Sequence, residues 1–259
     1  CSVPRFWEKV YAGVQEKIAE TTGIKKALML DAIRVGKIHN IDYLRKGKTP
    51  PLMLHLKYQF YEKTVYSLLK KTIGIENGNF FPTAGAAVPD EICEFVHSVG
   101  INMLVGYGLT ESTATVSCFQ NSGYEIGSVG TVMPDVEVKI GENNEILLRG
   151  KTITKGYYKK AEATAEAIDK EGWFHTGDAG YLNGDCLYLT ERIKDLFKTS
   201  NGKYISPQAL ETKLAIDRYI DQIAIIADQR KFVSALIVPM YGFVKDYAKE
   251  KGIEYKDME

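Results

Sequence analysis

The sequence predicts an α/β protein that carries a β-rich subdomain and a smaller α+β domain toward its C-terminal end. Three patterns support this prediction. A strand, a helix and a strand pattern follow one another over residues 79–108, short strand patterns with close turn signals fill 121–191, and helix and strand patterns alternate over 192–259. We therefore expect three parts, which divide after residues 120 and 191.

The first part begins with helices. Apolar residues at helical spacing, among them Phe6, Val10 and Val14, predict helices from Arg5 to about Gly36. A second helical run, LMLHLKYQFYEKTVYSLLKKTIG, follows the helix-breaking pair of prolines at 50–51. We expect these helices to pack together.

A βαβ unit is predicted next. The stretch NFFPTAGAAV indicates a strand that runs into a turn of small residues, PDEICEFVHSVG a helix that closes on Gly100, and INMLVGYG an apolar strand. Strand, helix and strand at this spacing place the loops at one edge of a parallel sheet.

Short strands dominate the second part, as in VGTVMPDVEVKIGENNEILLRG and GDCLYLTERI. The stretch ERIKDLFK is the expected junction to the third part. There SNGKYISP predicts a turn, QALETKLAI a helix, QIAIIAD and VSALIVP two strands, and a last helix follows.

Composition excludes several classes of protein. Lys plus Arg and Asp plus Glu both total 33, so no net charge draws the chain toward nucleic acid. The chain lacks an apolar run of about 18 residues and a signal-peptide pattern, and no strongly basic amphipathic face is evident. Its four cysteines are scattered without CxxC pairs, which argues against structural zinc and disulfides and favours a cytoplasmic setting.

The stretch GYGLTE, residues 106–111, carries ligand-type side chains. Its glycines allow close approach of the backbone to a ligand, and Tyr107 offers an aromatic face for a purine. Thr110 can donate to a phosphate oxygen, and Glu111 suits Mg²⁺. Alternatively, this is a glycine turn in which Thr110 caps a following helix and Glu111 lies near the positive end of that helix.

Two later stretches have similar alternatives. GWFHTGDAGYL places Asp178 in a glycine-flanked turn, where its carboxylate can accept from two ribose hydroxyls or simply satisfy its own turn. ERIKDLFK contains Arg192, Lys194 and Lys198. The planar guanidinium of Arg192 suits ribose or phosphate oxygens, whereas solvated charges on a linker would explain the same run.

Taken together, these stretches resemble the adenylate-forming (AMP-forming) acyl-CoA synthetase superfamily. TAGAAVPDEI, GYGLTE, NEILLRGKTITKGYYKKAEATAEAI, GWFHTGD and RIKDLFKTSNGKYISP match its motifs, in order, over essentially the whole chain. VPRFWEKVYAGVQEKI and KTSNGKYISP look most like long-chain fatty acid CoA ligases. The resemblance implies a partial acyl-CoA synthetase fold with a truncated, mobile C-terminal domain.

The resemblance also implies an activity and a cofactor set. A fatty acid would react with ATP to give acyl-AMP and pyrophosphate, and the acyl group would then pass to coenzyme A. Glu111 would hold Mg²⁺, and Thr110 would contact a phosphate oxygen. Adenine would lie against Tyr107 and the backbone of Gly85, Ala86 and Ala87, and Asp178 and Arg192 would hold the ribose. Gly108 is a further expected nucleotide-binding residue.

For the C-terminal domain, the resemblance makes Lys194 the hinge about which this domain swings between the two half-reactions. Gly202 would lie near the path of coenzyme A, and Lys198 near the acyl phosphate. The phosphate loop of the family is expected before residue 1, and its catalytic lysine beyond Glu259. We therefore expect the 259-residue chain, taken alone, to be inactive.

Other functions stay open at this point. An acyl-AMP ligase that loads a carrier protein, or an activator of another carboxylic acid, would use the same fold. A non-catalytic nucleotide-binding module would use the same turns. An insoluble fatty acid substrate also suggests peripheral contact of a cytoplasmic enzyme with a membrane surface.

Overall fold

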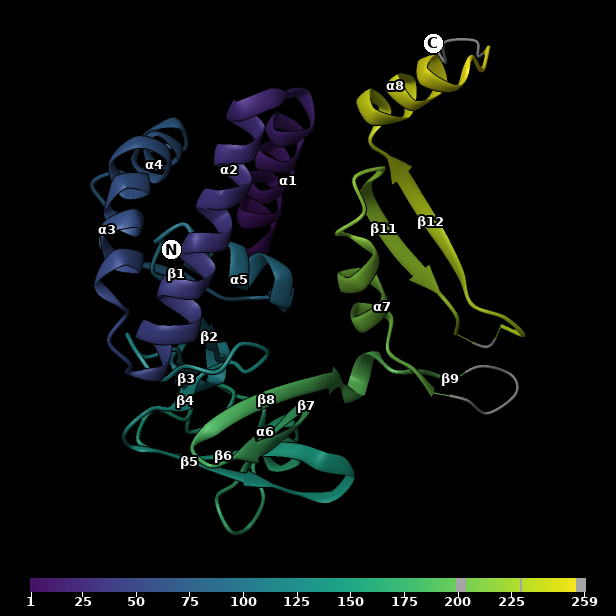
Figure 1. Cartoon of the computed structure of the whole chain (residues 1–259). Coiled ribbons are helices and arrows are strands. Elements are labelled where there is room, and N and C mark those ends of the chain that lie inside the picture. The colour runs from purple at the N-terminus through teal and green to yellow at the C-terminus, as the bar shows by residue number, and fades with distance from the viewer. Residues whose placement is uncertain (199–203, 229, 255–259) are drawn as a thin grey trace. The chain divides into compact units, whose positions relative to one another are not determined.

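The computed structural model describes residues 1–198, 204–228 and 230–254 (Figure 1). The chain divides into two compact units, Cys1–Thr190 and Glu191–Glu259. Residues 1–120 and 121–190 lie in the same unit, and the division into three parts stays a prediction.

An eight-stranded sheet organises the first unit. Its strand order is β1-β2-β3-β4-β8-β7-β6-β5. β1 and β2 are parallel, whereas β2–β3–β4 and β5–β6–β7 pair antiparallel. The bounds are β1 Phe81–Thr83, β2 Met103–Tyr107, β3 Ser117–Cys118, β4 Thr131–Val132, β5 Val136–Ile140, β6 Glu145–Gly150, β7 Phe174–Asn183 and β8 Cys186–Arg192.

The predicted βαβ unit is confirmed. Helix α5 (Asp90–Ser98) connects β1 to β2, and Thr83 lies opposite Val105 in the parallel register. Because parallel strands end at the same edge of a sheet, the loops that follow β1 and β2 leave from one edge.

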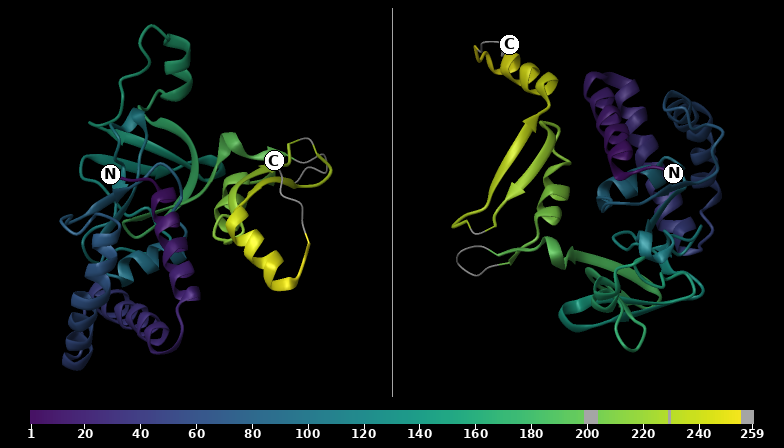
Figure 2. Two further views of the ribbon diagram at one scale, coloured as in Figure 1. Left: turned by 90° about the horizontal axis from the view of Figure 1, so that it is seen from above. Right: turned by 180° about the vertical axis from the view of Figure 1, so that it is seen from behind.

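Helices cover one end of this unit, and Figure 2 shows from two further directions that they gather on the side of β1 and β2 away from β5 to β8. α2 packs against α1, α3 and α5. The bounds are α1 Pro4–Glu20, α2 Gly23–Gly36, the π-helix η1 Lys37–Tyr43, the 3₁₀ turn η2 Leu44–Lys46, α3 Leu52–Tyr61, the π-helix η3 Glu62–Tyr66 and α4 Ser67–Thr72.

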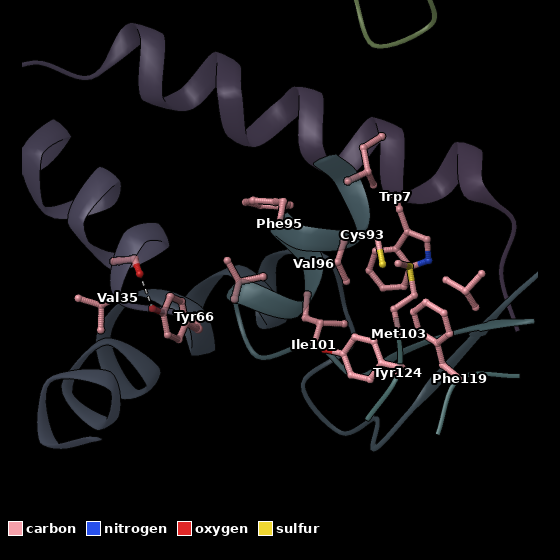
Figure 3. Close-up of a cluster of buried hydrophobic side chains, with 14 of the residues drawn as sticks. Trp7, Val35, Tyr66, Cys93, Phe95, Val96, Ile101, Met103, Phe119 and Tyr124 are labelled. Atoms are coloured by element: carbon pink, nitrogen blue, oxygen red, sulfur yellow. Dashed lines mark hydrogen bonds between the residues drawn. The ribbon is translucent and has the colours of Figure 1, made fainter. Parts of the chain in front are cut away.

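The core between these helices and β1–β2 is closed by large side chains with satisfied polar atoms (Figure 3). Trp7 is fully buried, and its indole Nε1 donates to Thr83 Oγ1 at 2.8 Å. The hydroxyl of the fully buried Tyr66 donates to the carbonyl of Ala32 at 2.6 Å. The Trp7 bond fixes the end of β1 to helix α1.

A second core lies under the β-rich end of the sheet and contains Val116, Ile146, Leu148 and Leu187. One helix, α6 (Ala161–Ala167), interrupts the strands here and is absent from the sequence-based expectation. With its run of small residues and glutamates, AEATAEA favours a helix by propensity without the apolar periodicity of a buried one.

The second unit has a short strand pair, β9 and β10, near its start, although Tyr204 and Ile205 of β10 were predicted to lie in a turn. The predicted order of a helix, two strands and a last helix follows. β11 and β12 pair antiparallel, and the backbone N–H of Ile225 donates to Glu211 of α7 at 2.8 Å. The bounds are η6 Ile193–Asp195, β9 Phe197–Lys198, β10 Tyr204–Ile205, α7 Pro207–Leu214, β11 Ile220–Ile226, β12 Ser234–Pro239 and α8 Tyr241–Lys251.

No helix in residues 1–198, 204–228 or 230–254 combines the length and the apolar composition that crossing a membrane requires.

The buried His97 should make the fold sensitive to mild acid. His97 is 6% exposed and its ring stacks on Tyr124. The Nε2 atom of the ring has no hydrogen-bond partner among the described residues. Burial lowers the pKa of His97 to about 4, so the unfolded chain binds this proton more readily than the folded chain. The contribution to stability is complete above the ordinary histidine pKa of about 6.5 and declines as the pH falls toward the folded value.

Urea unfolding of the wild type and of His97→Phe, which keeps a ring against Tyr124, measures this effect. Between about pH 7.5 and about pH 5, the wild type should lose roughly 2 kcal/mol more of its free energy of unfolding than the variant. Equal losses in both proteins would show that His97 does not titrate as its burial requires.

Candidate active site

The glycine at position 108 is required by the chain itself. A Cβ on Gly108 would lie 1.8 Å from the carbonyl oxygen of Ala114, because the chain reverses after β2 and passes close to its own backbone. The sequence-based reason for this glycine, close approach to a ligand, is therefore not needed to explain it. The reversal leads into β3, where Ser117 pairs with Tyr107.

No regular helix follows this turn, so the alternative in which Thr110 caps one is wrong. Thr110 lies inside the single 3₁₀ turn η4 (Thr110–Ser112) and is exposed. The backbone N–H of Leu109 donates to Ser112 Oγ at 2.9 Å. Thr113 and Ala114 then adopt left-handed φ angles of 56° and 78°, which end the turn and direct the chain into β3.

The loop after β1 lies at the same sheet edge as this turn. Residues 84–87 are exposed, and Gly85 has a φ of +94° that side chains with a Cβ rarely adopt. The structure thus brings the predicted adenine loop, Gly85, Ala86 and Ala87, to the edge at which Gly108 and Thr110 follow β2.

Asp178 lies within strand β7, and its predicted placement in a turn is wrong. Gly177 has a φ of 74°, and the pairing of β6 with β7 is irregular between Glu145 and Leu147, so the glycine signals mark a bulge. Glycine serves turns and bulges alike, which is why the sequence did not separate them. The backbone N–H of Asp178 donates to Thr176 Oγ1 at 3.0 Å, and this satisfies the local backbone.

A hydrogen bond joins two predicted site residues that lie 71 positions apart. The Tyr107 hydroxyl donates to Asp178 Oδ2 at 2.7 Å. Tyr107 is only 8% exposed and packs in the second core, so little of its ring face is open to a purine in this conformation. The half-buried carboxylate of Asp178 therefore accepts a hydrogen bond from the hydroxyl of a buried tyrosine.

Glu111 is held by a segment that the sequence analysis did not assign to the site. The Tyr157 hydroxyl donates to Glu111 Oε1 at 2.8 Å, and the backbone N–H of Thr154 donates to the Glu111 carbonyl at 2.7 Å. Thr113 Oγ1 donates to the Thr152 carbonyl at 2.6 Å. The hydrogen bond to Glu111 raises the pKa of the Tyr157 hydroxyl.

Tyr157 is therefore a candidate site residue that sequence reasoning missed. It lies in TKGYYKK, a stretch that was matched to a family motif without a role for its aromatic residues. The only available signal was the tyrosine pair after Gly156, since the partner of Tyr157 is 46 positions away.

Arg192, Lys194 and Lys198, three of the predicted site residues, lie in the second unit. The Arg192 guanidinium lies 3.7 Å from Asp195 Oδ2 and is about half exposed. The backbones of Lys194 and Lys198 lie in η6 and β9. The side chains of these two lysines, and the whole of Gly202, lie outside the described residues.

A magnesium ion at Glu111 would have one protein carboxylate as ligand. Within the described residues, no group of three or more His, Cys, Asp or Glu side chains could hold a metal ion. This donor set fits Mg²⁺, which keeps several waters and is often bound by one or two carboxylates plus substrate phosphates.

The fold defines an α/β protein in which the loops after two parallel strands leave from one edge of the sheet, which is where open α/β sheets bind ligands. The model of the AMP-binding enzyme family matches residues 1–158 of this chain. The chain belongs to this family, and the predicted membership is confirmed.

Known proteins agree with this membership. The chain is 30% identical over 275 residues to the peroxisomal long chain acyl-CoA synthetase 7 of Arabidopsis thaliana, an alignment that covers all of this chain and 38% of the relative. A solved structure of O-succinylbenzoate coenzyme A synthetase from Bacillus subtilis, in complex with ATP and magnesium ion, is also similar to this chain, with a TM-score of 0.56 and 26% sequence identity. The match covers 66% of this chain and 40% of the synthetase chain.

The solved adenylation domain of a carboxylate reductase from Mycobacterium chelonae matches this chain with a TM-score of 0.67 and 22% sequence identity. The match covers 96% of this chain and 36% of the reductase chain. At this identity, the similarity shows that the fold is shared and nothing more. The predicted partial acyl-CoA synthetase fold is confirmed. The chain spans about two fifths of the length of these relatives.

The bond between Tyr107 and Asp178 can be measured by a double-mutant cycle of Tyr107→Phe and Asp178→Asn. We expect a coupling energy of about 1–2 kcal/mol in urea unfolding, because a hydroxyl donates to a half-buried carboxylate. A control cycle of Tyr181→Phe with Asp178→Asn should give a coupling close to zero, because Tyr181 stacks on Tyr188. Equal coupling in both cycles would disprove the specific pairing.

Proposed function

We propose that the full-length gene product is a long-chain fatty acid CoA ligase (AMP-forming). The observation that carries this proposal is the contact of Glu111 with the segment around Tyr157, in a chain of the AMP-binding family. The similarity to a long chain acyl-CoA synthetase supports the choice of substrate and of coenzyme A as acceptor.

The proposed reaction has two steps. The fatty acid carboxylate oxygen attacks the α-phosphorus of ATP, the bond from this phosphorus to the bridging oxygen breaks, and pyrophosphate leaves. The coenzyme A thiol, once deprotonated, then attacks the acyl carbon of acyl-AMP and forms a thioester, and AMP leaves with the electron pair of the broken bond between the acyl carbon and the phosphate oxygen. No protein side chain forms a covalent bond with a substrate in this reaction. The protein binds and orients the substrates and stabilises the charge that develops on the phosphates.

In this reaction we assign adenine to the exposed loop of Gly85, Ala86 and Ala87, with Tyr107 and Gly108 beside it. Stacking on Tyr107 would need more of its ring than the 8% now exposed, so its hydroxyl bond to Asp178 is the better supported contribution. Asp178 would accept the ribose hydroxyls with its carboxylate, which also accepts from the Tyr107 hydroxyl.

At the phosphate end, Glu111 would hold Mg²⁺ and the exposed Thr110 would donate to a phosphate oxygen. When bound, the ion offsets negative charge on the phosphates. Tyr157 orients Glu111 by donating to one of its oxygens, which leaves the other oxygen for coordination.

The roles proposed for the second unit rest on the family resemblance alone. Arg192 would contact the ribose, Lys194 would act as the hinge, and Lys198 and Gly202 would lie near the acyl phosphate and coenzyme A.

We also propose a cytoplasmic location for the enzyme. All four cysteines lie in the described residues and are free thiols, which suits a reducing compartment.

ATP–pyrophosphate exchange by the full-length product tests the activity. Across fatty acids from short to long, with aryl and amino acids included, exchange should be highest with a long fatty acid. Glu111→Ala and Asp178→Ala should each reduce it about 100-fold or more, whereas the exposed Glu142→Ala should not. Absence of exchange with every acid would favour a nucleotide-binding module.

Two further arms of this assay separate the related proposals. Coenzyme A and carrier-protein thiols, offered in parallel, distinguish the CoA ligase from an acyl-AMP ligase that loads a carrier. The 259-residue chain, assayed alongside, should form no acyl-CoA, and detectable product would contradict that expectation.

Tyr157→Phe tests how Glu111 is positioned. The variant loses the hydroxyl that holds the carboxylate, so the Mg²⁺ concentration for half-maximal exchange should rise roughly tenfold, with little change at saturating Mg²⁺. Tyr158→Phe is the matched control, because the neighbouring Tyr158 is 86% exposed. The same Mg²⁺ dependence in both variants would remove Tyr157 from the site.

A further inference from the structure

The outer side of α3 and α4 carries a row of exposed apolar side chains. Leu52 and Met53 are 71% and 77% exposed, and the exposed residues Leu56, Phe60 and Leu68 continue the row. We call these five residues the α3–α4 face. Single exposed apolar residues are ordinary on a protein surface, whereas a contiguous set marks an interaction surface.

The geometry of the helix keeps these residues on one side. Leu52, Leu56 and Phe60 follow one another at intervals of four residues, which places them on one side of an α-helix. Because an α-helix has 3.6 residues per turn, each side chain in this row is rotated slightly around the axis relative to the one before it. The π-helix η3 (Glu62–Tyr66) has a wider turn than an α-helix, so each of its residues rotates less around the axis and partly cancels this drift before Leu68. The opposite side packs into the helical core through Tyr58, Val65 and Leu69.

Positive charge is concentrated along the same stretch. The whole chain has 33 basic and 33 acidic residues, yet residues 52–72 contain four lysines and one acidic residue. Lys57, Lys63 and Lys71 are exposed beside the apolar row. Lys57 also forms an ion pair of 2.8 Å with Asp31 of α2. The α3–α4 face is therefore apolar and has exposed lysines on the same helices.

We propose that the α3–α4 face binds the surface of a lipid bilayer that contains anionic headgroups. Its leucine, methionine and phenylalanine side chains would enter the boundary between headgroups and acyl chains, and the lysines would contact lipid phosphates. Charge complementarity favours this partner over a second copy of the chain, because two such faces would bring their lysines together. The proposal does not rest on ligase activity.

The sequence analysis found no strongly basic amphipathic face. Two features of this region hide it. The π turn breaks the α-helical period between Phe60 and Leu68, and two of its lysines, Lys57 and Lys70, form ion pairs that are set by the fold. Exposure, which separates Leu52 and Met53 from the partly buried Leu54, is visible only in the structure.

Cosedimentation of the chain with lipid vesicles tests this proposal. The protein should bind vesicles of phosphatidylcholine with added phosphatidylserine, bind phosphatidylcholine alone weakly, and dissociate as salt increases. The variant with Met53→Glu and Phe60→Glu, and the variant with Lys63→Glu and Lys71→Glu, should bind at least about fivefold more weakly. The control Phe232→Glu changes a 72% exposed aromatic residue in the second unit and should bind as the wild type does.

Each outcome decides the question. The substituted side chains are exposed, so circular dichroism and thermal unfolding should show all variants folded. No vesicle binding by the wild type, or equal binding by all three variants and the wild type, would overturn the proposal. Self-association of the wild type without vesicle binding, lost with Met53→Glu and Phe60→Glu, would make this face an interface between copies. Failure of ATP exchange would leave the vesicle result unchanged.

Discussion

The parallel pairing of β1 with β2 positions most candidate ligand groups in the first unit. It holds because α5 returns the chain across the sheet and buries Ile92, Val96 and the neighbouring Met103 almost completely. Since both strands then end at one edge, the loop of Gly85 and the turn of Thr110 leave the sheet together. Trp7 adds a hydrogen bond at the end of β1, so this edge also depends on the first helix.

The β-rich part of the first unit completes the site by supplying partners to the turn after β2. Asp178 accepts from Tyr107, and the segment of Thr154 and Tyr157 holds the backbone and the side chain of Glu111. A site built in this way depends on contacts between distant parts of the chain. Its rigidity follows from the second core, in which Tyr107 itself is packed.

The sequence predicted those features that are encoded locally. The βαβ unit follows from apolar periods and from glycine and proline signals within about thirty residues, and the order of elements in the second unit follows in the same way. The site residues Tyr107, Glu111 and Asp178 came from their residue types and a family resemblance. What failed required knowledge of the tertiary structure: Gly177 indicates a bulge only once β6 lies beside it, and Tyr157 joins the site only through a partner 46 positions away.

The π turn in the middle of the α3–α4 helix makes the length of this segment as important as its composition. A π turn accommodates extra residues in the helix, so loss of one residue between Glu62 and Tyr66 would favour an ordinary α-helix there. All residues that follow would rotate by about 100° around the axis relative to α3. Leu69 would then turn out of the core, and Leu68 would turn away from the α3–α4 face. This segment should therefore tolerate substitutions at its exposed positions much better than insertions or deletions, and homologous chains should keep its length while they vary its exposed side chains.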